Sequence, residues 1–142
     1  MESPTSTLND RDSESKLSTY ITFEDRSTYE FEYVPTDAGN LYVEYSKDLK
    51  YTQKPVILTF HDVGYNSKSN FDYFFSNPKM KSILEHFSLI QVNALGQEYY
   101  SSDMDDKQKY PSFGRLARAI HQIIVHFSVN EIIGLGVSVK RL

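Results

Sequence analysis

The stretch from Lys54 to Tyr65, KPVILTFHDVGY, constrains the fold of this chain more than any other. Its first part, Val56 to Phe60, is an almost unbroken run of apolar, β-branched and aromatic residues. A run without polar alternation is typical of a strand covered on both faces, as in a parallel sheet. We therefore predict a central parallel strand that leads directly into a loop.

The loop after this strand carries candidate functional residues. His61 and Asp62 stand at the carboxyl end of the strand, and Gly64 follows in the turn. In open α/β sheets, ligands and catalytic groups collect at the carboxyl ends of the strands. Two roles remain open for His61, Asp62 and Gly64: an architectural one, in which the side chains tie the loop to its neighbours, and a ligand contact of the oxyanion-loop type.

An antiparallel hairpin is expected before the central strand. Apolar and acidic residues alternate from Tyr29 to Val34, which is typical of a half-exposed strand. Turn-forming residues follow, and Leu41 to Tyr45 has the pattern of a second strand.

Two helices are expected after the central strand. Asn77 as cap and Pro78 at the first helical position begin the first, which ends near His86. Ser112 caps the second, which ends near Phe127. The residues expected to face inward are Met80, Ile83, Leu84 and Phe87 in the first, and Phe113, Leu116, Ala117, Ile120, Ile123, Ile124 and Phe127 in the second. Core packing under the His61 loop is expected for Phe71, Tyr73, Phe74 and Phe75.

Two further buried strands, Phe87 to Ala94 and Glu131 to Val137, alternate with these helices. The predicted fold class is α/β, with an initial antiparallel hairpin followed by a mostly parallel sheet and flanking helices. It occupies residues 29–142. Residues 1–28 are rich in Ser, Thr, Asp and Glu, which predicts a disordered polar leader.

Composition excludes several classes of function. The net charge of -4 gives no electrostatic reason to expect a nucleic-acid partner. The absence of cysteine excludes disulfides and thiol catalysis. No apolar run reaches the roughly 18 residues of a membrane span, and the polar N-terminus does not match a signal peptide, so we expect a cytoplasmic protein. No nucleotide motif appears, and no cofactor is predicted.

The last predicted strand ends with the spacing of a nucleophile elbow, G-x-S-x-G. Gly134, Gly136 and Ser138 occupy its first, third and fifth positions. The third position of an active elbow is the nucleophilic serine on a sharp turn. Gly136 keeps the turn without a hydroxyl, so a degenerate elbow is predicted. The alternative is that Ser138 acts as a displaced nucleophile.

The segment ILTFHDV is similar to the strand-end motif LTFDDG of metal-dependent polysaccharide deacetylases. Such enzymes need histidines on one face. His121 and His126 are five residues apart and diverge by about 140° around a helix. Glu85 and His86 lack the second histidine of a zinc-protease helix. No metal site is predicted.

Four segments resemble the N-myc downstream-regulated (NDRG) family, in the same order and at similar spacing: KPVILTFHDVGYN, FDYFF, PSFGRLARAI and EIIGLGV. The similarity covers roughly Tyr29 to Val137. It implies an α/β-hydrolase fold that has lost its catalytic serine. It also implies a cytoplasmic role in signalling, stress response, differentiation or trafficking through protein contacts.

The chain stops soon after Ser138, whereas an α/β-hydrolase domain usually needs about 200 to 250 residues. We therefore expect that roughly the second half of the domain is missing, through a short isoform or intron read-through. The strand Glu131 to Val137 would then be a bare apolar edge that favours self-association and a marginally stable fold. Two alternatives to a non-enzymatic interaction protein stay open: a divergent hydrolase with residual esterase activity, and a small-ligand binding module.

Overall fold

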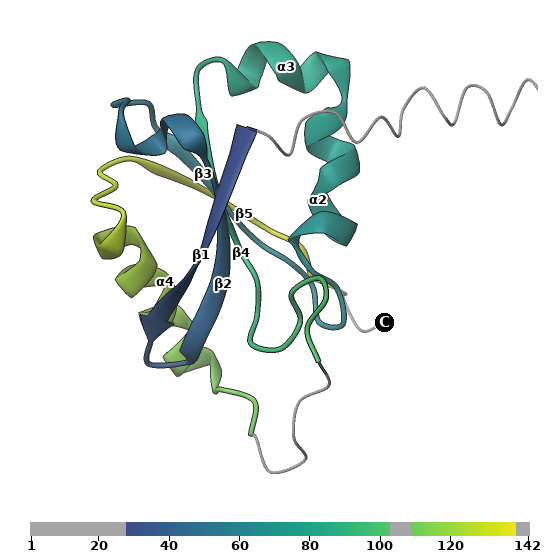
Figure 1. Cartoon of the computed structure of the whole chain (residues 1–142), viewed down its shortest axis with the longest axis vertical. Coiled ribbons are helices and arrows are strands. Elements are labelled where there is room, and N and C mark those ends of the chain that lie inside the picture. Colours follow the sequence, from purple (N-terminus) through teal and green to yellow (C-terminus); the bar gives the residue numbers. More distant parts are fainter. Residues whose placement is uncertain (1–27, 103–108, 139–142) are drawn as a thin grey trace, which may run out of the picture.

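The fold is built on one five-stranded sheet with helices on both of its faces (Figure 1). The computed structural model describes residues 28–102 and 109–138. The elements are β1 (Tyr29–Thr36), β2 (Gly39–Ser46), the 3-10 helix η2 (Lys47–Lys50), β3 (Val56–Phe60), α2 (Ser67–Ser76), α3 (Pro78–Leu84), β4 (Ser88–Val92), α4 (Phe113–His126) and β5 (Ile132–Gly136). All but the last residue of the predicted leader, 1–28, lies outside the described residues.

The strand order β1-β2-β4-β3-β5 confirms the predicted fold class. β1 and β2 form the expected antiparallel hairpin, and β2 also pairs antiparallel with β4. β3 lies between β4 and β5 and is parallel to both. The apolar run from Val56 to Phe60 is therefore the parallel strand between two neighbours that its sequence predicted.

Each face of the sheet has its own hydrophobic cluster. Val56 and Leu58 of β3 pack with Leu116, Ala119 and Ile123 of α4. The alternate residues of the strand point the other way, because successive side chains of a strand lie on opposite faces. Figure 1 accordingly shows α4 on one side of the sheet and both α2 and α3 on the other.

The second hydrophobic cluster is covered by a helix, α2, which the sequence pattern did not predict. Residues 67–76 form the helix α2, of which Phe71 and Phe75 are buried against Ile57 and Leu89. The expectation of core packing is wrong for Tyr73, which is 72% exposed, and for Phe74, which is 45% exposed. A helix turns about 100° per residue, so these four neighbouring aromatic residues cannot all face the sheet.

The inward faces of α3 and α4 also differ from those expected. In α3, Met80 and Leu84 pack against the core, whereas Ile83 is exposed. In α4, Phe113 and Ala117 are exposed, and Ala119, which was not expected to face inward, is fully buried. The buried stripe of α4 is centred on Leu116, Ala119 and Ile123 at helical spacing. Apolar residues cover so wide an arc of this helix that the sequence pattern does not fix the centre of the buried face.

The exposure of β5 corrects the expectation of a buried last strand and agrees with the expectation of an apolar strand at the edge of the sheet. Four of its five residues are exposed, including Ile132 and Ile133. The physical reason is that β5 ends the strand order and pairs only with β3 within residues 28–102 and 109–138. The apolar pattern identified a strand, while its exposure follows from its position at the edge.

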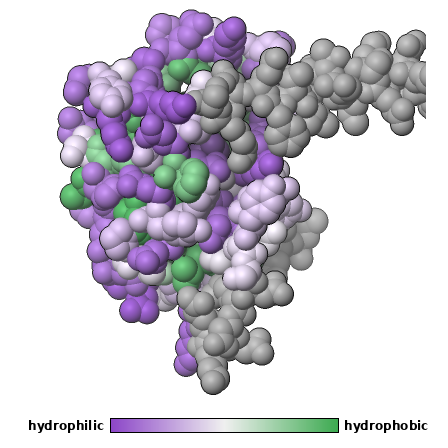
Figure 2. Space-filling view, in the orientation of Figure 1, coloured by the Kyte–Doolittle hydropathy of each residue, from purple (hydrophilic) through white to green (hydrophobic). Residues whose placement is uncertain are grey.

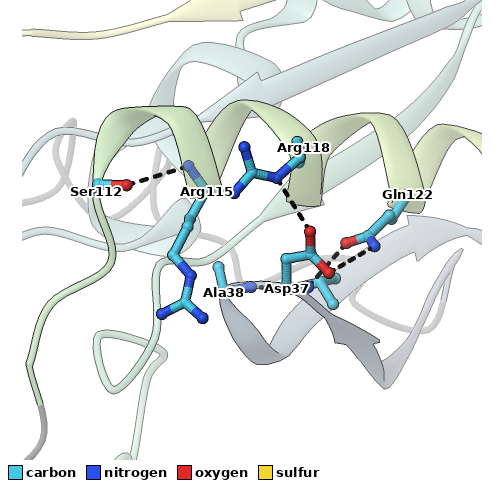
Figure 3. A network of polar contacts seen from close by, with 7 residues as sticks. Asp37, Ala38, Ser112, Arg115, Arg118 and Gln122 are labelled. Atoms are coloured by element: carbon cyan, nitrogen blue, oxygen red, sulfur yellow. Dashed lines mark hydrogen bonds and ion pairs between the residues drawn. The ribbon is translucent and has the colours of Figure 1, made fainter.

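Polar contacts fix the hairpin tip to α4 (Figure 3). The Asp37 carboxylate accepts hydrogen bonds from Gln122 Nε2 and Arg118 Nε, both at 3.1 Å, and the Asp37 amide donates to Gln122 Oε1 at 2.8 Å. The hydrogen bond from Gln122, and to a smaller extent the one from Arg118, lowers the pKa of the Asp37 carboxyl group. A second contact joins Glu32 Oε1 of β1 to His126 Nε2 at 3.1 Å. These contacts hold the hairpin against the helix that covers it.

We expect Gly39→Ala to destabilise the fold by about 1–3 kcal/mol. Gly39 has a φ of +101°, and a Cβ added there would lie 3.3 Å from Leu95 Cδ1. Gly114 provides the matched control, because it lies in α4 and a Cβ there would meet only Arg118 Nη1 at 3.9 Å. Gly114→Ala should stabilise the helix by up to about 1 kcal/mol. Urea denaturation measures the free energy of unfolding of both variants. If the two substitutions changed it in the same direction, the strain expected at Gly39 would be contradicted.

No helix in the described part of the chain combines the length and the apolar character needed to cross a membrane.

Candidate functional site

His61 follows the last residue of β3 and is 3% exposed. Its Nε2 lies 2.8 Å from the backbone nitrogen of Ala94, just beyond the end of β4. Its Nδ1 lies 2.8 Å from the carbonyl oxygen of Asp62. A backbone N–H can only donate, so Nε2 accepts the hydrogen bond and Nδ1 carries the ring proton. The two partners therefore define a neutral ring with one tautomer.

The environment of His61 favours this neutral state. Burial lowers the pKa of the imidazole, and it outweighs the opposing effects of the Asp62 carbonyl and the Asp62 charge. Neither ring nitrogen is available to act as a general base unless a backbone hydrogen bond breaks first. In this geometry the ring joins the carboxyl end of β3 to that of β4.

Asp62 and Gly64 build the turn that follows. Asp62 Oδ1 accepts from the Val63 amide at 2.8 Å, and the Asp62 carbonyl accepts from the Tyr65 amide at 3.1 Å. Gly64 has a φ of +80°, which suits the third residue of such a turn. Its amide donates to Gln97 Oε1 at 3.2 Å. The turn is thus closed by its own backbone and by a side chain from the loop after β4.

A buried polar network continues from this loop into α2. Asn66 and Ser69 form a reciprocal capping box at the start of the helix. The Ser67 amide donates to Asn93 Oδ1 at 2.8 Å, and its hydroxyl donates to Glu44 Oε2 at 3.2 Å. Sequence reasoning did not single out Glu44, Ser67 or Asn93. The available signal was Asn93, a polar residue directly after the strand β4.

Two side chains of the His61 loop face outward. Val63 is 75% exposed and Tyr65 is 50% exposed, whereas His61 and Asp62 are buried. A molecule that approaches this loop from solvent would therefore contact Val63 and Tyr65 first.

The elbow residues lie beside the same loop. Gly136 is the last residue of β5 and pairs with Phe60, and the Val137 amide donates to the Phe60 carbonyl at 3.2 Å. Gly134 lies within β5, and Ser138 is exposed two residues after the strand ends. Gly136 lacks the positive φ that Gly39, Gly64 and Gly96 have. The structure thus brings the predicted elbow next to the His61 loop, with Gly136 in extended strand.

The histidines of α4 take part in a different arrangement. His126 contacts Glu32, while His121 is an exposed residue of the same helix. Within residues 28–102 and 109–138, no three side chains of the His, Cys, Asp and Glu types lie close enough together to hold a metal ion.

Among solved structures, the chain is similar to 2-hydroxy-6-oxo-6-phenylhexa-2,4-dienoate hydrolase from Rhodococcus sp. strain RHA1. The TM-score is 0.44 and the sequence identity is 18%. The alignment covers 79% of this chain and 39% of the hydrolase.

Among curated proteins, the chain is 33% identical over 115 residues to Protein NDRG3 of Xenopus laevis, covering 81% of this chain and 30% of that protein. It is 39% identical over 84 residues to Protein NDRG4-B of Xenopus laevis, and the alignment covers 59% of this chain and 23% of that protein. Protein NDRG1 of Xenopus tropicalis is 36% identical over 84 residues, with coverage of 59% and 21%. The chain spans less than a third of the length of each of these relatives.

A model of the Ndr family matches residues 31–140. This region begins at the third residue of β1 and includes strands β2 to β5, the His61 loop and the Gly134 to Ser138 segment. The resemblance noted from four short segments therefore extends over most of the chain. The chain belongs to the Ndr family.

Proposed function

We propose that this protein is a non-enzymatic member of its family that acts through protein contacts in signalling, stress response, differentiation or trafficking, in the cytoplasm. The observation that supports this most is Gly136, which holds the nucleophile position of the elbow spacing and has no hydroxyl group. The engaged ring of His61 adds support, because both of its nitrogens serve the backbone.

Ester hydrolysis tests the absence of catalysis. With p-nitrophenyl acetate, we expect the 142-residue chain to give no more turnover than an equal concentration of the heat-denatured chain. Ser138→Ala should leave this background unchanged. Turnover that is lost on Ser138→Ala would instead support the divergent hydrolase, with Ser138 as a displaced nucleophile.

A second candidate function is the binding of a small ligand at the His61 loop. It is favoured by the exposed Val63 and Tyr65 next to a turn held in place by hydrogen bonds. Benzoate and hexanoate serve as aromatic and aliphatic probes in an NMR titration. Saturable shifts at Val63 and Tyr65, without shifts at the exposed Tyr51, would support binding; equal or absent shifts would count against it.

For the protein contact itself, we propose that two copies pair through the outer edge of β5, which has no second neighbouring strand among the described residues. Ile132, Ile133 and Val137 are exposed close together on one segment. On the face drawn in Figure 2, by contrast, hydrophobic side chains form small patches separated by hydrophilic ones. An apolar edge strand with unpaired backbone groups can accept a further strand, and charged residues at such an edge oppose pairing.

We expect Ile133→Lys to lower self-association at least several-fold in sedimentation equilibrium. The control is Val125→Lys, because Val125 is also an exposed apolar residue, at 61%, but lies on α4. Val125→Lys should leave self-association close to that of the unchanged chain. An equal loss in both variants, or none in Ile133→Lys, would contradict pairing through β5.

A further inference from the structure

A row of three polar side chains crosses the sheet beneath α2. Glu44 of β2 pairs with Gln91 of β4, and Gln91 pairs with Thr59 of β3. All three lie on the face opposite α4, since their neighbours along the strands pack into the α4 cluster. The exposed fractions are 9% for Glu44, 4% for Gln91 and 0% for Thr59. The row is therefore enclosed between the sheet and its second helical layer.

Two atoms of this row have no hydrogen-bond partner among the described residues. They are Thr59 Oγ1 and Gln91 Oε1, on side chains that face the same side of two paired strands. The remaining side chain, Glu44, accepts a hydrogen bond from Ser67 of α2. A buried polar atom that leaves water without a new partner destabilises a fold, so native structures satisfy nearly all such atoms with protein or ordered water.

We propose that one ordered water molecule binds between Thr59 and Gln91. The carbonyl oxygen of Gln91 can only accept, so the water donates one proton to it. The Thr59 hydroxyl can donate to the water oxygen. The second proton of the water then points along the row to the Glu44 carboxylate, whose two oxygens can accept several hydrogen bonds at once. Three hydrogen bonds are typical for a buried water.

This water would connect strands that belong to different parts of the sheet. Thr59 lies in the parallel part, two residues before His61, and Glu44 belongs to the hairpin. The bridge would therefore stabilise the junction between the hairpin and the parallel strands, under the helix that follows the His61 loop.

Substitutions of similar shape test the proposal through the sign of their effect. If the water is bound, Thr59→Val and Gln91→Met each break a hydrogen bond and should lower the melting midpoint by about 4–8 °C. The double variant should lose less than the sum, because both side chains share one water. If the two atoms are simply unsatisfied, each variant should raise the midpoint. Gln53→Met, at an exposed position, controls for the change of side-chain type.

Water-to-protein NOEs in the unchanged 142-residue chain provide a second and independent measurement. We expect long-lived water NOEs to the Thr59 methyl group and the Gln91 side-chain amide, and their loss in the double variant. Destabilising substitutions without such NOEs would overturn the proposal. If the chain shows no cooperative melt, the NOEs alone decide, and their absence overturns the proposal.

Discussion

Replacing Ile123 with alanine is expected to lower the free energy of unfolding by about 2–5 kcal/mol. Ile123 is 0% exposed and lies where α4 packs on β3 and on the hairpin. The substitution removes the contacts of a buried side chain and leaves a cavity that its neighbours fill only partly. Because small domains have total stabilities of about 5–15 kcal/mol, this loss is a large fraction of the total stability.

Val125→Ala is the matched control for this variant. Val125 lies two residues further along α4 and is 61% exposed, so its truncation should change stability by less than about 0.5 kcal/mol. Urea denaturation followed by circular dichroism measures both variants. Similar losses for Ile123→Ala and Val125→Ala would mean that α4 is not packed on the sheet as described.

The second large effect concerns pH and His61. Protonation of Nε2 would break the hydrogen bond from the Ala94 amide and place a charge in a buried site. We expect acidification to cost the fold about 1–3 kcal/mol at this residue, the usual penalty for a buried group that loses its partner.

The direction of this effect follows from the lowered pKa. The folded-state pKa of His61 lies below the ordinary value of 6.5, so the unfolded chain binds the proton more readily. The contribution of His61 to stability is therefore fully present above pH 6.5, and it is lost as pH falls from there through the folded-state pKa. Urea midpoints measured across this range at constant ionic strength report the loss.

His61→Gln separates this titration from that of other groups. The Gln oxygen can accept from the Ala94 amide near the position of Nε2, and the side chain does not titrate. We expect a shallower fall of stability below pH 6.5 in this variant than in the unchanged chain. If stability fell with pH equally in His61→Gln and in the unchanged chain, protonation of His61 would not be the cause of the loss.

Sequence reasoning identified the strands because their patterns are strong. The apolar run before His61 is typical of a strand with neighbours on both sides, and the alternation from Tyr29 to Val34 is typical of a half-exposed strand. The caps Asn77 and Ser112 likewise marked the first turns of α3 and α4.

The features that it missed depend on packing between distant segments. α2 was overlooked because four aromatic residues close together conceal the helical spacing of Phe71 and Phe75. The apolar pattern of β5 alone predicts a buried strand, and only the separate expectation of a bare edge agrees with its exposure, which is set by its place in the strand order.

The candidate site was predicted only in part, for a similar reason. The sequence placed His61 and Asp62 at a strand end, and the β3 and β5 pairing brings Gly136 beside them. It did not show that the His61 ring accepts from Ala94, because that contact joins residues 33 positions apart. The ligand-contact and elbow roles of these residues stay predictions.

The most direct test of a non-catalytic protein is labelling with a fluorophosphonate probe, which reacts with activated serine hydroxyls. Intact mass spectrometry of the 142-residue chain should show no more adduct in the folded protein than after heat denaturation, because Gly136 offers no hydroxyl group. Adduct formation that requires the folded chain and maps to Ser138 would contradict this account, since it would show an activated nucleophile next to the His61 loop.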